Sequence, residues 1–201
     1  MHTNTIRRTS LALAAALLVA GLGLTGCNST QHKRSGFIPQ SVQLTKADDL
    51  VSKWGGKLDV GTFAVAKIVP ATTPYTNKYG DIDAVQLSEV RLAMNEALGA
   101  EFKDFGGKAG GRTLVIHAAI TEIKPNKPLL NVAPQTQIIK RGYGYATCEI
   151  YATDGENGPI VAALMQTHDT QRFGTEKFSE SGTAKQAAEE SAKRFRKLIG
   201  G

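Results

Sequence analysis

The chain has 201 residues and a formal net charge of +6, and 41% of its residues are hydrophobic. This length suits one domain with an N-terminal extension. The mild positive charge and the lack of any RNA- or DNA-reading motif argue against a nucleic-acid partner, and two cysteines are too few for a disulfide-rich scaffold.

The first 26 residues have the three-part layout of a secretory signal. Arg7 and Arg8 precede an apolar run over residues 11–24, and small residues then lead to Cys27. The run is shorter than the roughly 20 residues that a spanning helix needs. The sequence therefore predicts a signal peptide over residues 1–26, and its removal would leave a chain of net charge +4 because Arg7 and Arg8 leave with it.

Leu24-Thr25-Gly26-Cys27 resembles the bacterial lipobox. The resemblance implies that the Cys27 thiol receives a diacylglyceryl group, that cleavage makes Cys27 the N-terminus, and that further acylation (palmitate, for example) completes the anchor. In lipoproteins of this kind, an Asp directly after the cysteine retains the protein in the inner membrane. This chain has Asn28 at that position, so the resemblance implies the outer membrane and a periplasmic orientation. The alternative is an ordinary signal peptide followed by a chance cysteine.

Residues 27–43 are polar and aperiodic, which predicts a lipidated tether before a domain over residues 44–201. Phe37 and Ile38 mark the point where the chain is expected to touch the folded body first. The apolar residues of 44–54 fit a short helix, but the choice between helix and strand stays open for 44–56.

The remaining pattern predicts six elements in chain order. Asp83 and Gln86 have capping-box spacing at the start of the first helix, and the turn over residues 154–158 has the chemistry of a hairpin. The predicted elements are a strand over 62–69, a helix over 83–105, strands over 112–123, 143–153 and 159–170, and a helix over 183–199. This β-α-β-β-β-α order predicts an α+β fold, with one antiparallel or mixed sheet and two helices on one face.

Three features together resemble a family of Gram-negative bacterial lipoproteins catalogued as domain of unknown function 3313. They are Ser35-Gly36-Phe37-Ile38, the run Leu114–Lys127 into Pro128-Leu129-Leu130-Asn131, and the alanine-rich last helix. The family offers no catalytic residues that could be carried over to this chain.

The sequence holds no recognisable catalytic set, which predicts a protein that is not an enzyme and needs no cofactor. His32, His117 and His168 lack metal-ligand spacing, so no metal site is expected. No Gly-x-Ser-x-Gly motif occurs, and no single helix or strand presents a close pair of carboxylates. Cys148 alternates with small and apolar residues, which predicts a buried structural thiol.

Tyr143, Tyr145 and Tyr151 share one face of their strand, and we expect that face to point away from the helices. The tyrosines either cover the sheet surface or form an aromatic platform for a protein or glycan.

The connection over residues 124–141 is long and apolar, with basic residues at both ends, and is the predicted partner-contact segment. The residues expected to bind a partner are Lys127, Leu129, Leu130, Ile139, Arg141, Tyr143 and Tyr145. The alternative is that this segment folds back as a lid on its own sheet.

These expectations describe a membrane-anchored, non-catalytic lipoprotein that acts as an envelope adaptor or binding module. Its partner would be another cell-envelope protein or a cell-wall component. The alternative is a binder of a small apolar or glycan ligand on the open sheet face, and an enzyme ranks third.

Overall fold

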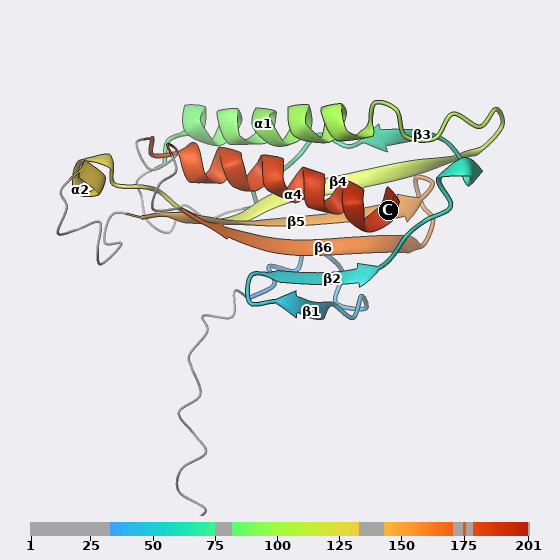
Figure 1. The fold of residues 1–201 in the computed structure, drawn as a ribbon, viewed down its shortest axis with the longest axis horizontal. Helices are drawn as coiled ribbons and strands as arrows, with labels where there is room; N and C mark the ends of the chain where they lie inside the picture. The colour runs from blue at the N-terminus through green and yellow to red at the C-terminus, as the bar shows by residue number, and fades with distance from the viewer. Residues whose placement is uncertain (1–32, 75–81, 133–142, 171–174, 176–178, 201) are drawn as a thin grey trace, which may run out of the picture. The chain divides into compact units, whose positions relative to one another are not determined.

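The computed structural model describes residues 33–74, 82–132, 143–170, 175 and 179–200. Six strands form a single sheet, and helices cover one face of it (Figure 1). The strands are β1 (Thr45–Asp48), β2 (Val51–Gly55), β3 (Phe63–Ile68), β4 (Arg112–Lys124), β5 (Tyr145–Asp154) and β6 (Ile160–Asp169). The helices are η1 (Val60–Thr62, a 3-10 turn), α1 (Ala84–Phe102), α2 (Pro128–Val132) and α4 (Gly182–Gly200).

The sheet is mixed, with the strand order β1-β2-β6-β5-β4-β3. β3 pairs with β4 in parallel, and every other neighbouring pair is antiparallel. α1 and α4 contact each other and pack on the same face of the sheet. The predicted α+β fold, with its mixed sheet and two covering helices, is confirmed.

The sequence places the two long helices through capping and apolar spacing. Asp83 caps α1 by accepting from the backbone N–H of Gln86, whose side chain accepts from the N–H of Asp83, so the predicted capping box is present. The inward stripe of α1 is Val90, Met94, Leu98 and Phe102. α4 buries mainly alanines, and such small side chains let a helix lie close to the strands beneath it.

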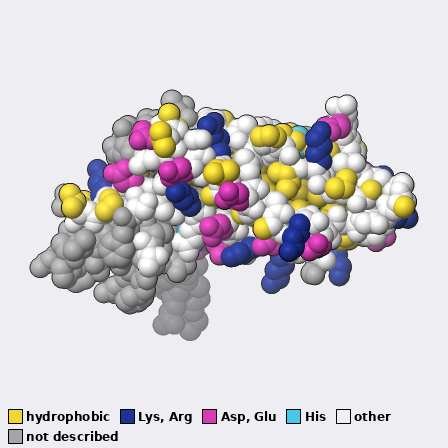
Figure 2. All heavy atoms as spheres, turned by 90° about the horizontal axis from the view of Figure 1, so that it is seen from above, with side chains coloured by type: hydrophobic (Ala, Val, Ile, Leu, Met, Phe, Trp, Pro, Cys, Tyr) yellow, Lys and Arg dark blue, Asp and Glu magenta, His cyan; other side chains and the backbone are white. Residues whose placement is uncertain are grey.

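The outward side of α1 is also partly apolar. Val85 is 66% exposed and Leu92 is 55% exposed, while Val65 of the neighbouring β3 is 51% exposed. Figure 2 views the side of the molecule that carries α1 and β3, and hydrophobic side chains gather there among charges of both signs. No helix among the described residues is both long enough and apolar enough to cross a membrane.

Alternation along β5 assigns the two faces of the sheet. Ala146, Cys148, Ile150 and Ala152 lie in the main core beneath the helices. Tyr145, Thr147, Glu149 and Tyr151 occupy the opposite face. The predicted separation of small residues from tyrosines along this strand is therefore correct.

Residues 45–48 and 51–55 form strands joined by a turn, although the apolar spacing of this segment fits a short helix. β1 and β2 make a hairpin, and β2 extends the sheet by pairing Val51 with Gln166 and Gly55 with Ala162 of β6. Without β2, the edge of β6 would expose unpaired backbone groups. A Cβ at Gly55, where φ is +81°, would lie 2.5 Å from the carbonyl oxygen of Val161, so this close pairing favours glycine.

Candidate functional site

Residues 34–42, which we call the strap, lie on the sheet face opposite the helices. Ile38 and Val42 of the strap are buried there against β6. The Glu149 carboxylate on β5 accepts a hydrogen bond from the backbone N–H of Ser35 at 2.7 Å and another from that of Ile38 at 3.1 Å. Glu149 has no exposed surface, and these two bonds replace part of the hydration that a buried carboxylate loses.

The Arg34 side chain holds the strap in its curved form. Its guanidinium donates to the carbonyl oxygens of Ile38 at 3.1 Å and Val42 at 2.9 Å, and also to that of Pro39. Hydrogen bonds from a charged donor are stronger than neutral ones. The half-buried residues that complete this second, smaller core are Phe37, Leu44, Trp54, Tyr151, Ile160 and Met165.

The strap lies within the range 27–43 that the sequence assigns to the tether. Phe37 and Ile38, expected to be the first residues to touch the body, do contact it. Ser35 and Val42 contact the body as well, so the sheet face opposite the helices is only partly open.

Three aromatic rings, those of Phe37, Tyr151 and His117, contact one another in a row on this face of the sheet. The ring centroids of Phe37 and Tyr151 are 5.4 Å apart, and His117 stacks on Tyr151 with centroids 4.6 Å apart and planes 13° apart. Burial lowers the pKa of His117, although the nearby Glu156 carboxylate acts in the opposite direction. Burial also raises the pKa of Tyr151. His117 therefore favours its neutral form and acts as a flat ring surface.

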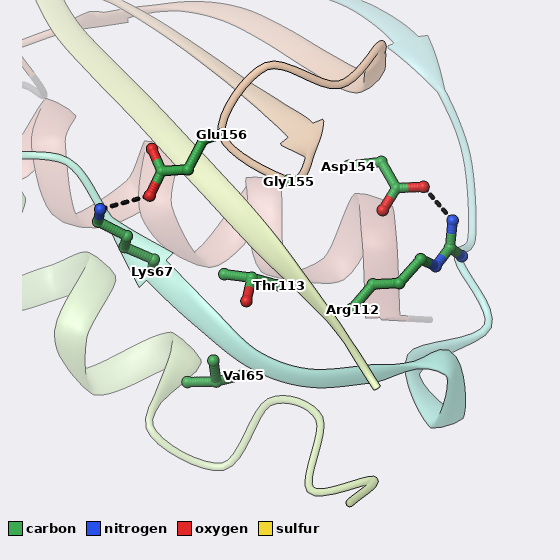
Figure 3. Close-up of a pocket in the computed structure, with 7 residues that line it drawn as sticks. All are labelled: Val65, Lys67, Arg112, Thr113, Asp154, Gly155 and Glu156. Carbon is green, nitrogen blue, oxygen red and sulfur yellow. Dashed lines mark hydrogen bonds and ion pairs between the residues drawn. The ribbon is translucent and has the colours of Figure 1, made fainter. Parts of the chain in front are cut away.

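An open groove of about 740 Å³ lies where β3 and β4 meet the turn between β5 and β6 (Figure 3). Lys67 forms an ion pair with Glu156, and Arg112 forms another with Asp154. Thr113 lies between the two pairs. The full lining is Val65, Lys67, Arg112, Thr113, Asp154, Gly155 and Glu156.

The groove suits a neutral, hydroxyl-rich ligand better than a strongly charged one. Both of its cations already have a carboxylate partner, so a charged ligand would have to replace an ion pair. Exposed ion pairs of this kind contribute only about 0–1 kcal/mol, and their outer lone pairs and N–H groups stay available to hydroxyls.

The two strand histidines lie on opposite faces of the sheet. His117 pairs with Tyr151, whereas His168 pairs with Ala146 on the helix side. His168 is 8% exposed, and its Nε2 has no hydrogen-bond partner among the described residues. Within the same part of the chain, no three His, Cys, Asp or Glu side chains come close enough to hold a metal ion. The two histidines therefore do not line a common pocket.

The predicted partner-binding residues lie in different surroundings. Lys127 and Leu129 are exposed at the start of α2, Leu129 to 91%, and Leu130 is half-buried. Tyr143 is only 5% exposed, so its ring offers little surface to a partner. Tyr145 is half-buried.

The hydroxyl of Tyr145 donates to Glu122 at 2.8 Å, which ties this ring to β4. Ile139, Arg141 and the predicted lipidation site Cys27 lie outside the described residues, as does His32. Of the predicted partner-binding residues, Lys127 and Leu129 are therefore exposed next to each other at the start of α2, whereas Tyr143 is buried.

The sequence predicts the contact of Phe37 and Ile38 with the body, but not the bonding of the strap to Glu149, and it does not predict the groove. Glu149 and most residues of the groove are charged or polar, and such residues usually indicate a solvated surface. One signal was available: Glu149 stands in the middle of a strand whose neighbours are small and apolar, so a carboxylate there needs a partner. Its partner is more than 100 residues away in sequence, and no local pattern identifies it.

Cys148 is predicted to be almost unreactive in the folded protein. Burial raises the pKa of its thiol to about 12, although the neighbouring Ser191 hydroxyl acts to lower it. Only the thiolate is nucleophilic, so at about pH 8 its reaction with a maleimide should be roughly a thousandfold slower than that of an exposed thiol. Mass spectrometry of native and urea-denatured protein measures both rates. Equal rates would place Cys148 at the surface.

Comparison with known proteins gives distant structural likenesses and one family. A search of curated proteins found no match. Among solved structures, the PelC dodecamer from Paraburkholderia phytofirmans is 13% identical, with a TM-score of 0.46, over 75% of this chain and 98% of that chain. A candidate lipoprotein from Caulobacter crescentus CB15 is 12% identical, with a TM-score of 0.32, over 63% and 82%. These likenesses are too distant to support an argument.

One family model matches residues 67–195, which include β4, β5, β6, all of α1 and most of α4. This match spans more than half of the chain and agrees with the resemblance of residues 114–131 and of the last helix. The protein therefore belongs to the family described as Protein of unknown function (DUF3313).

Proposed function

We propose that the protein is a non-catalytic binding module of the bacterial envelope, anchored through lipid on Cys27 in the outer membrane and facing the periplasm. Its partner is another envelope protein or a cell-wall component. The binding role is supported by the exposure of Leu129, whose side chain is 91% exposed at the start of α2. An apolar side chain this exposed is available to a partner, and a firmly held backbone beneath it lowers the entropy lost on docking.

Asn126 supplies that firm base. It is 2% exposed, and its amide nitrogen donates to the carbonyl of Ser179 at 2.7 Å and to the Thr183 hydroxyl at 2.9 Å. Its side-chain oxygen accepts from the backbone N–H of Gly144 at 2.9 Å and from the Thr170 hydroxyl at 2.7 Å. The segment before α2 is thus joined to β5, β6 and α4, and α2 loses little entropy on docking.

The proposal that the protein is not an enzyme rests on the environments of its reactive groups. Cys148 is buried with a raised pKa, the two strand histidines lie on opposite faces, and the carboxylates of the groove are paired with cations. None of these groups is placed to act as a general base or a nucleophile on a bound molecule.

A second candidate function is the binding of a glycan. The groove beside β3 favours it, because hydroxyl groups can bond to its ion pairs and its threonine without separating charges. A glycan in this groove would leave Leu129 free, so the two candidate functions can be tested separately.

The test replaces Leu129 with serine, with Leu92→Ser on α1 as the matched control, since Leu92 is also an exposed leucine. Removing a central apolar anchor costs at least about 1.4 kcal/mol of binding energy, so Leu129→Ser should weaken in-cell crosslinking to the envelope partner about tenfold. Leu92→Ser should retain it, and neither change should alter the melting temperature. Undiminished crosslinking by Leu129→Ser would contradict the adaptor function. If the Cys27→Ala variant is still acylated and still forms the crosslinks, the lipid anchor alone would be contradicted.

A further inference from the structure

The strap shortens the chain that is free to join the domain to a lipid anchor. If Cys27 is acylated as proposed above, only residues 28–33 separate it from Arg34, the first residue of the strap. A fully extended chain of that length spans at most about 25 Å. A compact unit the size of His32–Gly201 has a diameter of about 40 Å. A tether this short favours attachment of the domain to the bilayer by the side that carries the strap.

The surface around the strap has the chemistry of a membrane-facing surface. Its half-buried apolar residues include Phe37, Trp54 and Ile160, and tryptophan is enriched at the level of lipid headgroups. Lys33 is exposed beside the strap, and the sequence holds no acidic residue between Cys27 and Asp48. Basic residues near an anionic lipid surface contribute about 1 kcal/mol each.

The nearby acids do not cancel this positive charge at the surface. Glu149 is buried beneath the strap and accepts backbone hydrogen bonds. In the β1–β2 hairpin, Asp48 pairs with Arg194 and Asp49 pairs with Lys46. Close to the strap the surface is thus mildly basic and partly apolar, while the exposed Asp169 lies further along the same sheet face, opposite Tyr145.

We infer that the sheet face covered by the strap, around Phe37 and Trp54, lies against the lipid bilayer that anchors the protein. This inference rests on the proposed lipid anchor and adds an orientation to it. The strap fixes which face is near the membrane, because it is bonded to Glu149 and the remaining chain is short. The outward side of α1, where Leu92 is exposed, then faces away from the bilayer.

The single tryptophan makes this orientation measurable, because Trp54 reports alone on its surroundings. The protein, expressed in cells from the full chain so that any processing can occur, is mixed with vesicles of phosphatidylethanolamine and phosphatidylglycerol, with or without a lipid that carries a nitroxide on its headgroup. The matched control combines Trp54→Phe with Leu92→Trp, which moves the probe to the opposite layer. Circular dichroism checks that both proteins are folded.

The nitroxide lipid should quench a large part of the Trp54 fluorescence and leave that of the control unchanged. Protein that floats with the vesicles but shows equal quenching of both probes, or quenching of the control only, would overturn the orientation and leave the anchor intact. Protein that does not float with the vesicles would overturn the anchor and the orientation with it.

Discussion

Replacing Glu149 with alanine is expected to lower the free energy of unfolding by about 2–4 kcal/mol. The change removes a fully buried carboxylate and leaves the backbone N–H groups of Ser35 and Ile38 without their acceptor. Hydrogen bonds to a charged group contribute more than neutral ones, and an unsatisfied buried donor adds its own cost. Urea unfolding followed by circular dichroism measures the loss.

Glu149→Ala should also release the strap. Hydrogen exchange at the amide of Ile38 should become faster, whereas exchange in β5 should change less. Glu96→Ala, which removes an exposed carboxylate from α1, is the control and should change stability by less than about 0.5 kcal/mol. If the strap amides of Glu149→Ala stay protected, something other than the carboxylate holds the strap.

Replacing Asn126 with alanine is expected to cost about 3–4 kcal/mol, because its side chain satisfies several buried groups at once. The backbone N–H of Gly144 would lose its Asn126 acceptor but keep the Thr170 hydroxyl. The carbonyl of Ser179 would lose a donor at the start of α4. Thermal unfolding followed by circular dichroism measures the effect.

Asn126→Asp provides the sharper comparison. It keeps an acceptor for Gly144 and Thr170 but replaces the donating NH₂ group, so its carboxylate oxygen would face the carbonyl of Ser179. Both variants should therefore be destabilised, whereas Gln43→Ala, at an exposed position of the N-terminal segment, should not be. A melting temperature unchanged in Asn126→Ala would show that solvent replaces the whole network.

The main elements follow from the sequence because their signals are local. Asp83 and Gln86 start α1 through bonds between residues three apart, and the alternation along β5 sends Cys148 to the helix side and Tyr151 to the other. The lipobox-like sequence that ends at Cys27 is also a local pattern. Together with the run over residues 114–131, it indicates the family and the proposed anchor. Periodicity, capping and turn chemistry need no knowledge of distant residues.

Only the tertiary structure decides the state of 44–56, the strap and the groove. The apolar spacing of residues 44–54 fits a helix, yet pairing of β2 with the edge of β6 imposes strands. In the sequence, Glu149 is only a charged residue within a strand. In the folded protein it accepts hydrogen bonds from the backbone of Ser35 and Ile38, which are more than 100 residues away. The groove forms where Lys67 and Arg112 meet carboxylates of the β5–β6 turn. Each of these features depends on contacts between segments far apart in sequence, and their energies become available only once the sheet has formed.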